Sequence, residues 1–537
     1  MKIIAQKTAA VLLYDKEGQR PTERIDFDPA NRIGNVWHLD DAAVPENVPY
    51  LLEIDGVTTV DPRATVTTSS SVYGHYNKRP VYGMRRTLQP FADGYTAHRM
   101  DELVIYAAHV RGFTASATYG GEAGGTFRAL GEHAAYIRKM GFNAVELMPV
   151  YDFNECMHNK THRNYWGYGK GHYYAPKPAY AGEDDPVDAF RTMVKQLHEN
   201  GLDVILQMYF IETTSEEIIR TLVHWIRFYG VDGFHIIRPD GDLSSVPDSP
   251  YLTGTKLFTG TGGDREQVRC FDEGFLVDVR RFLRGEDNAA RNLSRYFLQA
   301  CHRVNFAAYH NGYTLYDVFS YEEKHNEANG EHNRDGTDYN YSMNFGTEGP
   351  AADETVREQR LRAVHNALLL TLTARDIPRI MMGDEVLRTQ NGNNNAYCID
   401  AEINYLNHQP EGAAADLPGW MRRAVAFRRQ MLSADNPFGH GGRRAGKMPS
   451  VSVHQADAWQ ENILPQSKYF AVYYERKEPL LLVVNLSARK QRIGLPDEIT
   501  GTFEQIIGTA STAAPERDGR YICPEPFSVA WYRLEKE

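Results

Sequence analysis

The chain has 537 residues, a net charge of −11 and 42% hydrophobic residues, which together predict about three globular domains and a large apolar core. The acidic balance argues against nucleic acid as a partner, because it would repel phosphate groups. The sequence has no run of 18 apolar residues, so no membrane span is expected, and the first residues are expected to form a strand rather than a secretory signal. Five scattered cysteines indicate a reducing cytoplasm rather than a disulfide framework or a metal site.

Residues 1–95 carry short apolar runs at 11–18, 34–41 and 49–56, broken by Gly, Asp and Pro. Such runs predict strands, and a small β-sandwich accommodates them. Two roles stay open for this domain: a packing module or a carbohydrate-binding module for glucans.

Residues 96–435 alternate between β-rich and helical segments. Strands are expected at 101–110, 142–150, 203–210, 231–237, 256–262, 304–310 and 377–384, and helices at 126–141, 185–201, 216–230 and 360–376. This alternation predicts a parallel sheet, and eight such strands would close a (β/α)8 TIM barrel.

Residues 436–537 return to a β pattern, with expected strands at 468–476, 478–487 and 528–536. We therefore predict a C-terminal β-sandwich, joined to the barrel by a linker at 436–450. The expected fold class is an α/β barrel flanked by two β-sandwiches.

Several motifs in the central region resemble the α-amylase superfamily (glycoside hydrolase family 13), and specifically its isoamylase and glycogen-debranching branch. They lie at 105–106, 109–114 (HVRGFT), 164–168 (NYWGY), 324–331 (KHNEANGE), 333–336 (NRDG), 383–385 (GDE) and 390–397 (QNGNNNAY). The resemblance covers roughly 300 residues and implies a barrel that acts on α-glucans such as glycogen or starch, at the C-terminal ends of its strands.

The chemistry of that branch needs carboxylates that this chain lacks. A retaining glycosidase uses two carboxyl groups about 5–5.5 Å apart, one as nucleophile and one as acid. By the resemblance, the nucleophile position is Ile237, the acid/base position is Gly260, and a third carboxylate position is Asn311. His235 stands where the branch places an arginine that orients the nucleophile.

A fourth departure supports the same interpretation. The third strand of the branch usually runs from an Asp to a substrate-contacting His, whereas this chain has QMYFIE at 207–212 and lacks both. Asp240, Asp242, Asp264 and Glu212 lie near the vacated positions and are expected to be solvated loop charges. The alternative is that one of them replaces a lost carboxylate, although a displacement of about 1 Å can already reduce the rate 10²-fold.

The resemblance assigns sugar contacts to Trp166, Tyr168, His235 and His310, with packing at the barrel mouth as the alternative for these side chains. No cofactor is implied and no metal site can be assigned. Some relatives hold calcium, but Asp335 and Asp338 are expected to serve loop turns.

Three functions remain open at this point. The first is a catalytically degenerate homologue that binds an α-glucan or maltooligosaccharide, or regulates an active debranching enzyme in a heteromer, as one plant isoamylase does. The second is an active debranching hydrolase that uses relocated acidic residues. The third is a structural scaffold that binds no sugar.

Overall fold

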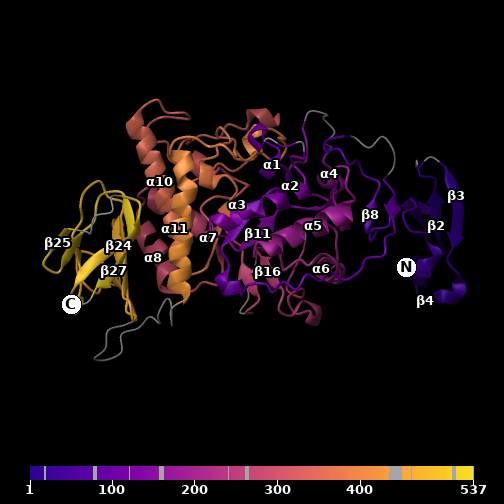
Figure 1. The fold of residues 1–537 in the computed structure, drawn as a ribbon, viewed down its shortest axis with the longest axis horizontal. Coiled ribbons are helices and arrows are strands. Elements are labelled where there is room, and N and C mark those ends of the chain that lie inside the picture. Colours follow the sequence, from indigo (N-terminus) through magenta and orange to yellow (C-terminus); the bar gives the residue numbers. More distant parts are fainter. Residues whose placement is uncertain are drawn as a thin grey trace.

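The computed structural model describes residues 1–16, 18, 20–75, 81–119, 121, 123–156, 162–239, 241–260, 265–433, 450–460, 462–510 and 516–535. Figure 1 shows three regions in a row, with N-terminal sheets at one end, a strand–helix body in the middle and C-terminal sheets at the other end. The predicted linker at 436–450 lies almost wholly outside the described residues. Within them, no helix combines the length and apolar character needed to cross a membrane.

The N-terminal region is a β-sandwich. One sheet has the order β1-β5-β4 and the other the order β3-β2-β6-β9-β8, with β7 also paired to β6. Alternate residues of these strands, such as Val11, Leu13, Trp37 and Leu52, fill the space between the sheets. The strands are β1 (Lys2–Ile4), β2 (Ala9–Tyr14), β3 (Pro21–Asp26), β4 (Arg32–Ile33), β5 (Val36–His38), β6 (Tyr50–Ile54), β7 (Val57–Thr59), β8 (Val66–Thr67) and β9 (Gly83–Met84).

The middle region is the predicted (β/α)8 barrel. Eight parallel strands follow the order β17-β16-β15-β14-β11-β10-β19-β18, and a parallel bridge between Cys270 and Arg303 links the two ends. The strands are β10 (Ile105–Ala108), β11 (Ala144–Leu147), β14 (Asp203–Tyr209), β15 (Gly233–Ile237), β16 (Lys256–Thr259), β17 (Val268–Cys270), β18 (Val304–Asn305) and β19 (Ile377–Met381). A separate hairpin joins β12 (Tyr151–Phe153) to β13 (Gly171–Pro176).

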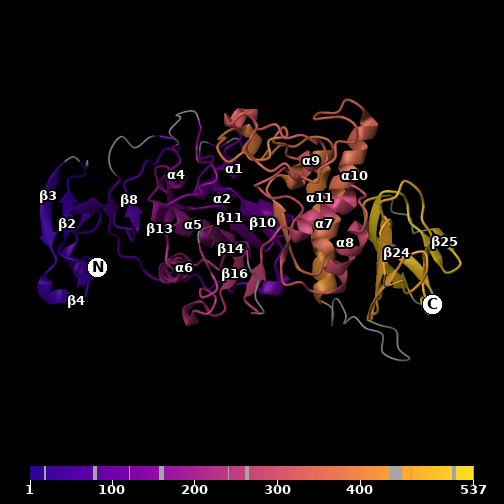
Figure 2. The same ribbon diagram turned by 180° about the vertical axis from the view of Figure 1, so that it is seen from behind.

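Helices surround these strands (Figure 2), and α5 and α6 each bury a mainly apolar face. They are α1 (Val110–Thr114), α2 (Phe127–Glu132), α3 (Ala134–Lys139), α4 (Pro178–Ala181), α5 (Pro186–Glu199), α6 (Ser215–Tyr229), α7 (Gly274–Leu283), α8 (Ala289–Leu298), α9 (Leu315–Val318), α10 (Glu354–Thr373) and α11 (Ala413–Ser433). Asp185 caps α5 by accepting hydrogen bonds from two backbone N–H groups, and Gly230 ends α6 in the left-handed region.

The C-terminal region is the predicted β-sandwich. Its sheets have the orders β20-β21-β22-β27-β24 and β23-β26-β25, with a shared core that includes Tyr473, Leu481, Val483 and Ile522. The strands are β20 (Val451–His454), β21 (Tyr469–Tyr474), β22 (Leu480–Asn485), β23 (Ile493–Gly494), β24 (Thr502–Gly508), β25 (Glu516–Asp518), β26 (Tyr521–Cys523) and β27 (Ser528–Glu535).

One predicted element was wrong in detail, and one barrel strand was not predicted. The single helix expected at 126–141 is two helices, because the backbone of His133 has φ −97° and ψ 8° and interrupts the helical hydrogen bonds. The apolar residues Leu130, Ala134 and Ile137 of this segment are nevertheless buried. β17 was not predicted, since three residues with a central arginine are too short for a periodic signal.

Candidate functional site

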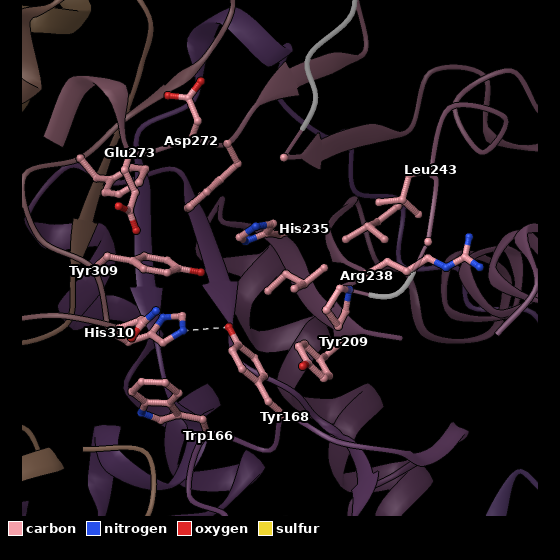
Figure 3. A pocket seen from close by; sticks show the side chains of 18 of the residues that line it. Trp166, Tyr168, Tyr209, His235, Arg238, Leu243, Asp272, Glu273, Tyr309 and His310 are labelled. Carbon is pink, nitrogen blue, oxygen red and sulfur yellow. Dashed lines mark hydrogen bonds between the residues drawn. The ribbon is translucent and has the colours of Figure 1, made fainter. Parts of the chain in front are cut away.

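A cavity of about 530 Å³ opens at the C-terminal ends of the barrel strands (Figure 3). Its walls come from the ends of β14, β15 and β16 and from the loops that follow β17 and β18. The lining residues are Trp166, Tyr168, Tyr209, His235, Ile236, Ile237, Arg238, Pro239, Gly241, Asp242, Leu243, Gly260, Phe271, Asp272, Glu273, Phe306, Tyr309, His310 and Asn311. This is the end of the barrel at which enzymes of this fold act.

All seven residues that the sequence singled out converge on this cavity. Ile237, Gly260 and Asn311 line it, as do Trp166, Tyr168, His235 and His310. No described atom lies within 4 Å of a Cβ built on Gly260, so the described part of the wall is open at this residue. An isoleucine, a glycine and an amide cannot supply a nucleophile and a proton donor for glycoside cleavage.

The acidic side chains at the rim are mostly engaged elsewhere. Asp242 accepts hydrogen bonds from the backbone N–H and the hydroxyl of Ser244. Asp272 forms an ion pair with Arg303 at 3.0 Å and accepts from the N–H of Gly274. Of the other candidates, Glu212 is an exposed loop residue paired with Lys170, as expected, whereas Asp240 and Asp264 lie outside the described residues.

Glu273 differs from these carboxylates. Its side chain points into the cavity above Tyr309 (Figure 3), and within the described ranges no hydrogen bond or ion pair holds it. Asp272 is its chain neighbour and points away, so these two acids do not face each other across the cavity. Glu273 was missed in the sequence because it follows the unpredicted strand β17.

Aromatic rings cover much of the cavity wall. Tyr168 stacks on Tyr209 with ring centroids 4.7 Å apart, and His235 stacks on Phe271 at 3.9 Å. Trp166 packs edge-on against His310 at 4.8 Å, and Tyr309 lies 4.0 Å from the same imidazole. Burial lowers the pKa of His310 well below its ordinary value, so its ring is neutral.

A buried ionic network lies beneath this wall. Glu146 on β11 accepts from Arg379 Nε on β19 at 2.5 Å and from His235 Nδ1 on β15 at 2.8 Å. Gln207 on β14 donates to the same carboxylate at 2.7 Å. Burial disfavours the charge on Glu146, but Arg379 and His235 more than offset this and lower the pKa of Glu146 below its ordinary range.

The sequence held a signal for this network that was not used. Glu146 and Arg379 are isolated charges within otherwise apolar strands, and both are nearly fully buried. A buried charge requires a partner, so two such residues of opposite sign in one barrel predict a contact. Their pairing could not be assigned because they are 233 positions apart.

A second polar cluster joins the motifs at 324–336 and 390–397. The Asn394 amide donates to Thr337 and Asn340 and accepts from Asn326 Nδ2 at 2.8 Å. Asp335 accepts from Asn329 and Asn395 and thereby serves a loop, as the sequence predicted. Among the residues that the structure describes, no group of three His, Cys, Asp or Glu side chains is arranged to hold a metal ion.

Comparison with known proteins shows similarity to isoamylases and glycogen-operon proteins. Isoamylase 1 of Oryza sativa subsp. japonica is 26% identical over 93% of this chain and 78% of its own length. A GlgX homolog of the glycogen operon of Mycobacterium tuberculosis is 30% identical over 61% of this chain and 58% of its own length. The chain is thus similar to the isoamylase and glycogen-debranching branch of the α-amylase superfamily, as its motifs predicted.

Solved structures support the fold of this chain. A group B streptococcal pullulanase in complex with maltotetraose superimposes with a TM-score of 0.76 at 15% identity, over 100% of this chain and 86% of that chain. No family model matches the sequence. The predicted fold class is confirmed, as is the resemblance to the debranching branch.

Proposed function

We propose that this debranching-branch member binds an α-glucan at the barrel mouth and does not cleave it by double displacement. The observation that carries the proposal is the cavity wall itself, where Ile237, Gly260 and Asn311 lie together and no two unengaged carboxylates face each other among the described lining residues. The pullulanase neighbour is described with maltotetraose bound, which supports a glucan as the ligand class.

The aromatic wall supports binding without catalysis. Tyr168, Tyr209 and Trp166 offer flat apolar surfaces beside polar groups, and sugars combine apolar ring faces with hydroxyl groups. The volume of about 530 Å³ lies within the range of ligand sites. A site that loses its cooperating catalytic groups loses about 10⁶-fold in rate, and further losses add little.

The test is a paired measurement on the purified protein. Calorimetry with maltohexaose should show binding, while a reducing-end assay on glycogen and pullulan should show no release above a heat-treated control. Release of reducing ends by the native protein would contradict the proposal. Absence of any maltooligosaccharide binding would instead favour a structural scaffold.

An active hydrolase with a relocated acid is the second candidate, and Glu273 is the residue that favours it. If reducing ends are released and Glu273→Gln abolishes the release, this candidate replaces the first. Asp242→Asn is the matched control, because Asp242 is at the same rim but is engaged by Ser244.

A regulatory role is part of the proposal but rests on resemblance alone. In that role the protein would form a heteromer with an active debranching enzyme in the cytoplasm. Native mass measurement of the protein mixed with an active isoamylase tests this directly. A mass equal to that of the separate chains at micromolar concentration would remove the heteromer.

A further inference from the structure

The Glu146 carboxylate is the buried end of a chain of hydrogen bonds that reaches the cavity. Glu146 Oε1 lies 2.7 Å from Gln207 Nε2 and 2.8 Å from His235 Nδ1, and Oε2 lies 2.5 Å from Arg379 Nε. An ionised carboxylate can only accept hydrogen bonds. Gln207, His235 and Arg379 must therefore all donate, which fixes the proton of His235 on Nδ1.

Gln207 links Glu146 to Tyr168 and fixes which of its own amide atoms donates and which accepts. Because its Nε2 donates to Glu146, its Oε1 faces Tyr168 at 2.9 Å and must accept from the Tyr168 hydroxyl. That hydroxyl has a single proton, so His310 Nε2, 2.8 Å from the same oxygen, must donate to it.

His235 lines the cavity, and its Nδ1 proton is used on Glu146. In the neutral form of this ring, Nε2 carries a lone pair and can only accept a hydrogen bond. We propose that Glu146 sets the hydrogen-bond polarity of this wall, so that the neutral His235 ring accepts from the ligand and the ligand is recognised through a donating hydroxyl group. The proposal rests on the proposed glucan binding and specifies how the glucan is recognised.

A second cavity supports the same proton positions. It has a volume of about 30 Å³, enough for one water molecule, and is lined by His310, Arg379 and Gln390 among others. His310 Nδ1, Arg379 Nη1 and Gln390 Oε1 are buried without a hydrogen-bond partner among the described residues. A water that accepts from Arg379 can donate to both other atoms only if His310 Nδ1 carries no proton, as the chain from Glu146 requires.

The first experiment reads the tautomers in the protein without ligand. Nitrogen-15 NMR of histidine-labelled protein, assigned with His235→Gln and His310→Gln, should show the proton on Nδ1 of His235 and on Nε2 of His310. The opposite tautomer at either ring would overturn the inference. This readout does not depend on glucan binding, so it separates failure of the inference from failure of the proposed function.

The second experiment replaces the Glu146 carboxylate, which can only accept hydrogen bonds, by an amide that can also donate them. In Glu146→Gln, Arg379 should hold the amide oxygen, which turns the NH₂ group toward His235 and Gln207. His235 should then carry its proton on Nε2, and Gln207 should turn over and convert His310 to the Nδ1–H form. Unchanged tautomers in a folded variant would contradict the inference. Glu385→Gln, another buried barrel glutamate, is the matched control and should leave both rings unchanged. If Glu146→Gln does not fold, the tautomers of the unaltered protein decide.

The third experiment uses ligands. Maltotetraose analogues in which one hydroxyl at a time is replaced by fluorine, which cannot donate, should include at least one that binds about tenfold or more weakly, because a buried acceptor is left unpaired. Equal affinity for maltotetraose and every analogue would overturn the inference. If maltotetraose itself does not bind, the proposed function fails while the tautomers still test the inference.

Discussion

The barrel mouth and the asparagine-rich loops beside it differ in how their side chains are used. At the mouth, Ile237, Gly260 and Asn311 line an open cavity, whereas the side chains of Asn326 and Asn394 are held in a buried hydrogen-bond network. The motifs that carried the resemblance most strongly are therefore scaffold rather than catalytic groups. A cleft can keep its supporting loops after its reacting groups are gone, because the two depend on different residues.

The largest expected effect is a gain of hydrolytic activity when three carboxylates are introduced at the barrel mouth. The triple variant Ile237→Asp, Gly260→Glu, Asn311→Asp should gain hydrolysis of pullulan by about 10³-fold or more over the unaltered protein, because positioned acid–base groups act together. Gly260 has room for the side chain. Reducing-end release measures the gain, and each single substitution is a control that should stay inactive. A folded, glucan-binding triple variant without activity would show that the mouth has lost more than its carboxylates.

Breaking the loop network should reduce stability rather than glucan affinity. Asn394→Asp removes two donated hydrogen bonds and places a charge where the side chain is fully buried, so the free energy of unfolding should fall by about 3 kcal/mol or more. Urea denaturation measures this. The same change at exposed Asn391, in the same loop, should shift it by less than about 0.5 kcal/mol. A similar fall in unfolding free energy at Asn394 and at Asn391 would contradict the expectation that burial of Asn394 causes the larger loss.

Tyr168 joins the mouth to the network beneath it. Tyr168→Phe keeps the ring that stacks on Tyr209 but removes the hydroxyl that contacts Gln207 and His310. The free energy of unfolding should fall by about 1–3 kcal/mol, because buried polar groups lose their partner. Thermal unfolding with and without maltohexaose separates stability from binding. Tyr209→Phe retains the same stack and should have the smaller effect.

The smallest effect concerns pH. The pKa of Glu146 is lowered in the folded protein, so its ionisation stabilises the fold above its unfolded pKa, and this stabilisation is lost as pH falls. The difference in unfolding free energy between the unaltered protein and Glu146→Gln should therefore narrow as pH decreases below about 4.5. Urea denaturation at several pH values measures this difference. A difference that stays constant or widens would contradict the depressed pKa.

Sequence reasoning reached the fold class and the convergence of Ile237, Gly260, Asn311 and the aromatic residues on one cavity, because local patterning and long motifs are encoded in contiguous residues. It missed Glu273, which follows a strand too short to recognise, and Tyr309, whose place against His310 depends on side-chain packing. It also predicted one helix at 126–141 where the structure has two, because the interruption at His133 depends on backbone angles rather than on composition.

The sequence by itself determined that Ile237, Gly260 and Asn311 carry no carboxylate, since no arrangement of the chain changes the identity of a side chain. Only the tertiary structure decided where charge and protons reside instead. Glu146, Gln207, His235 and Arg379 come from four different barrel strands, and each acquires its role from partners distant in the sequence. The physical reason is that a buried charge is set by its neighbours in space, and closure of the barrel is what makes these residues neighbours.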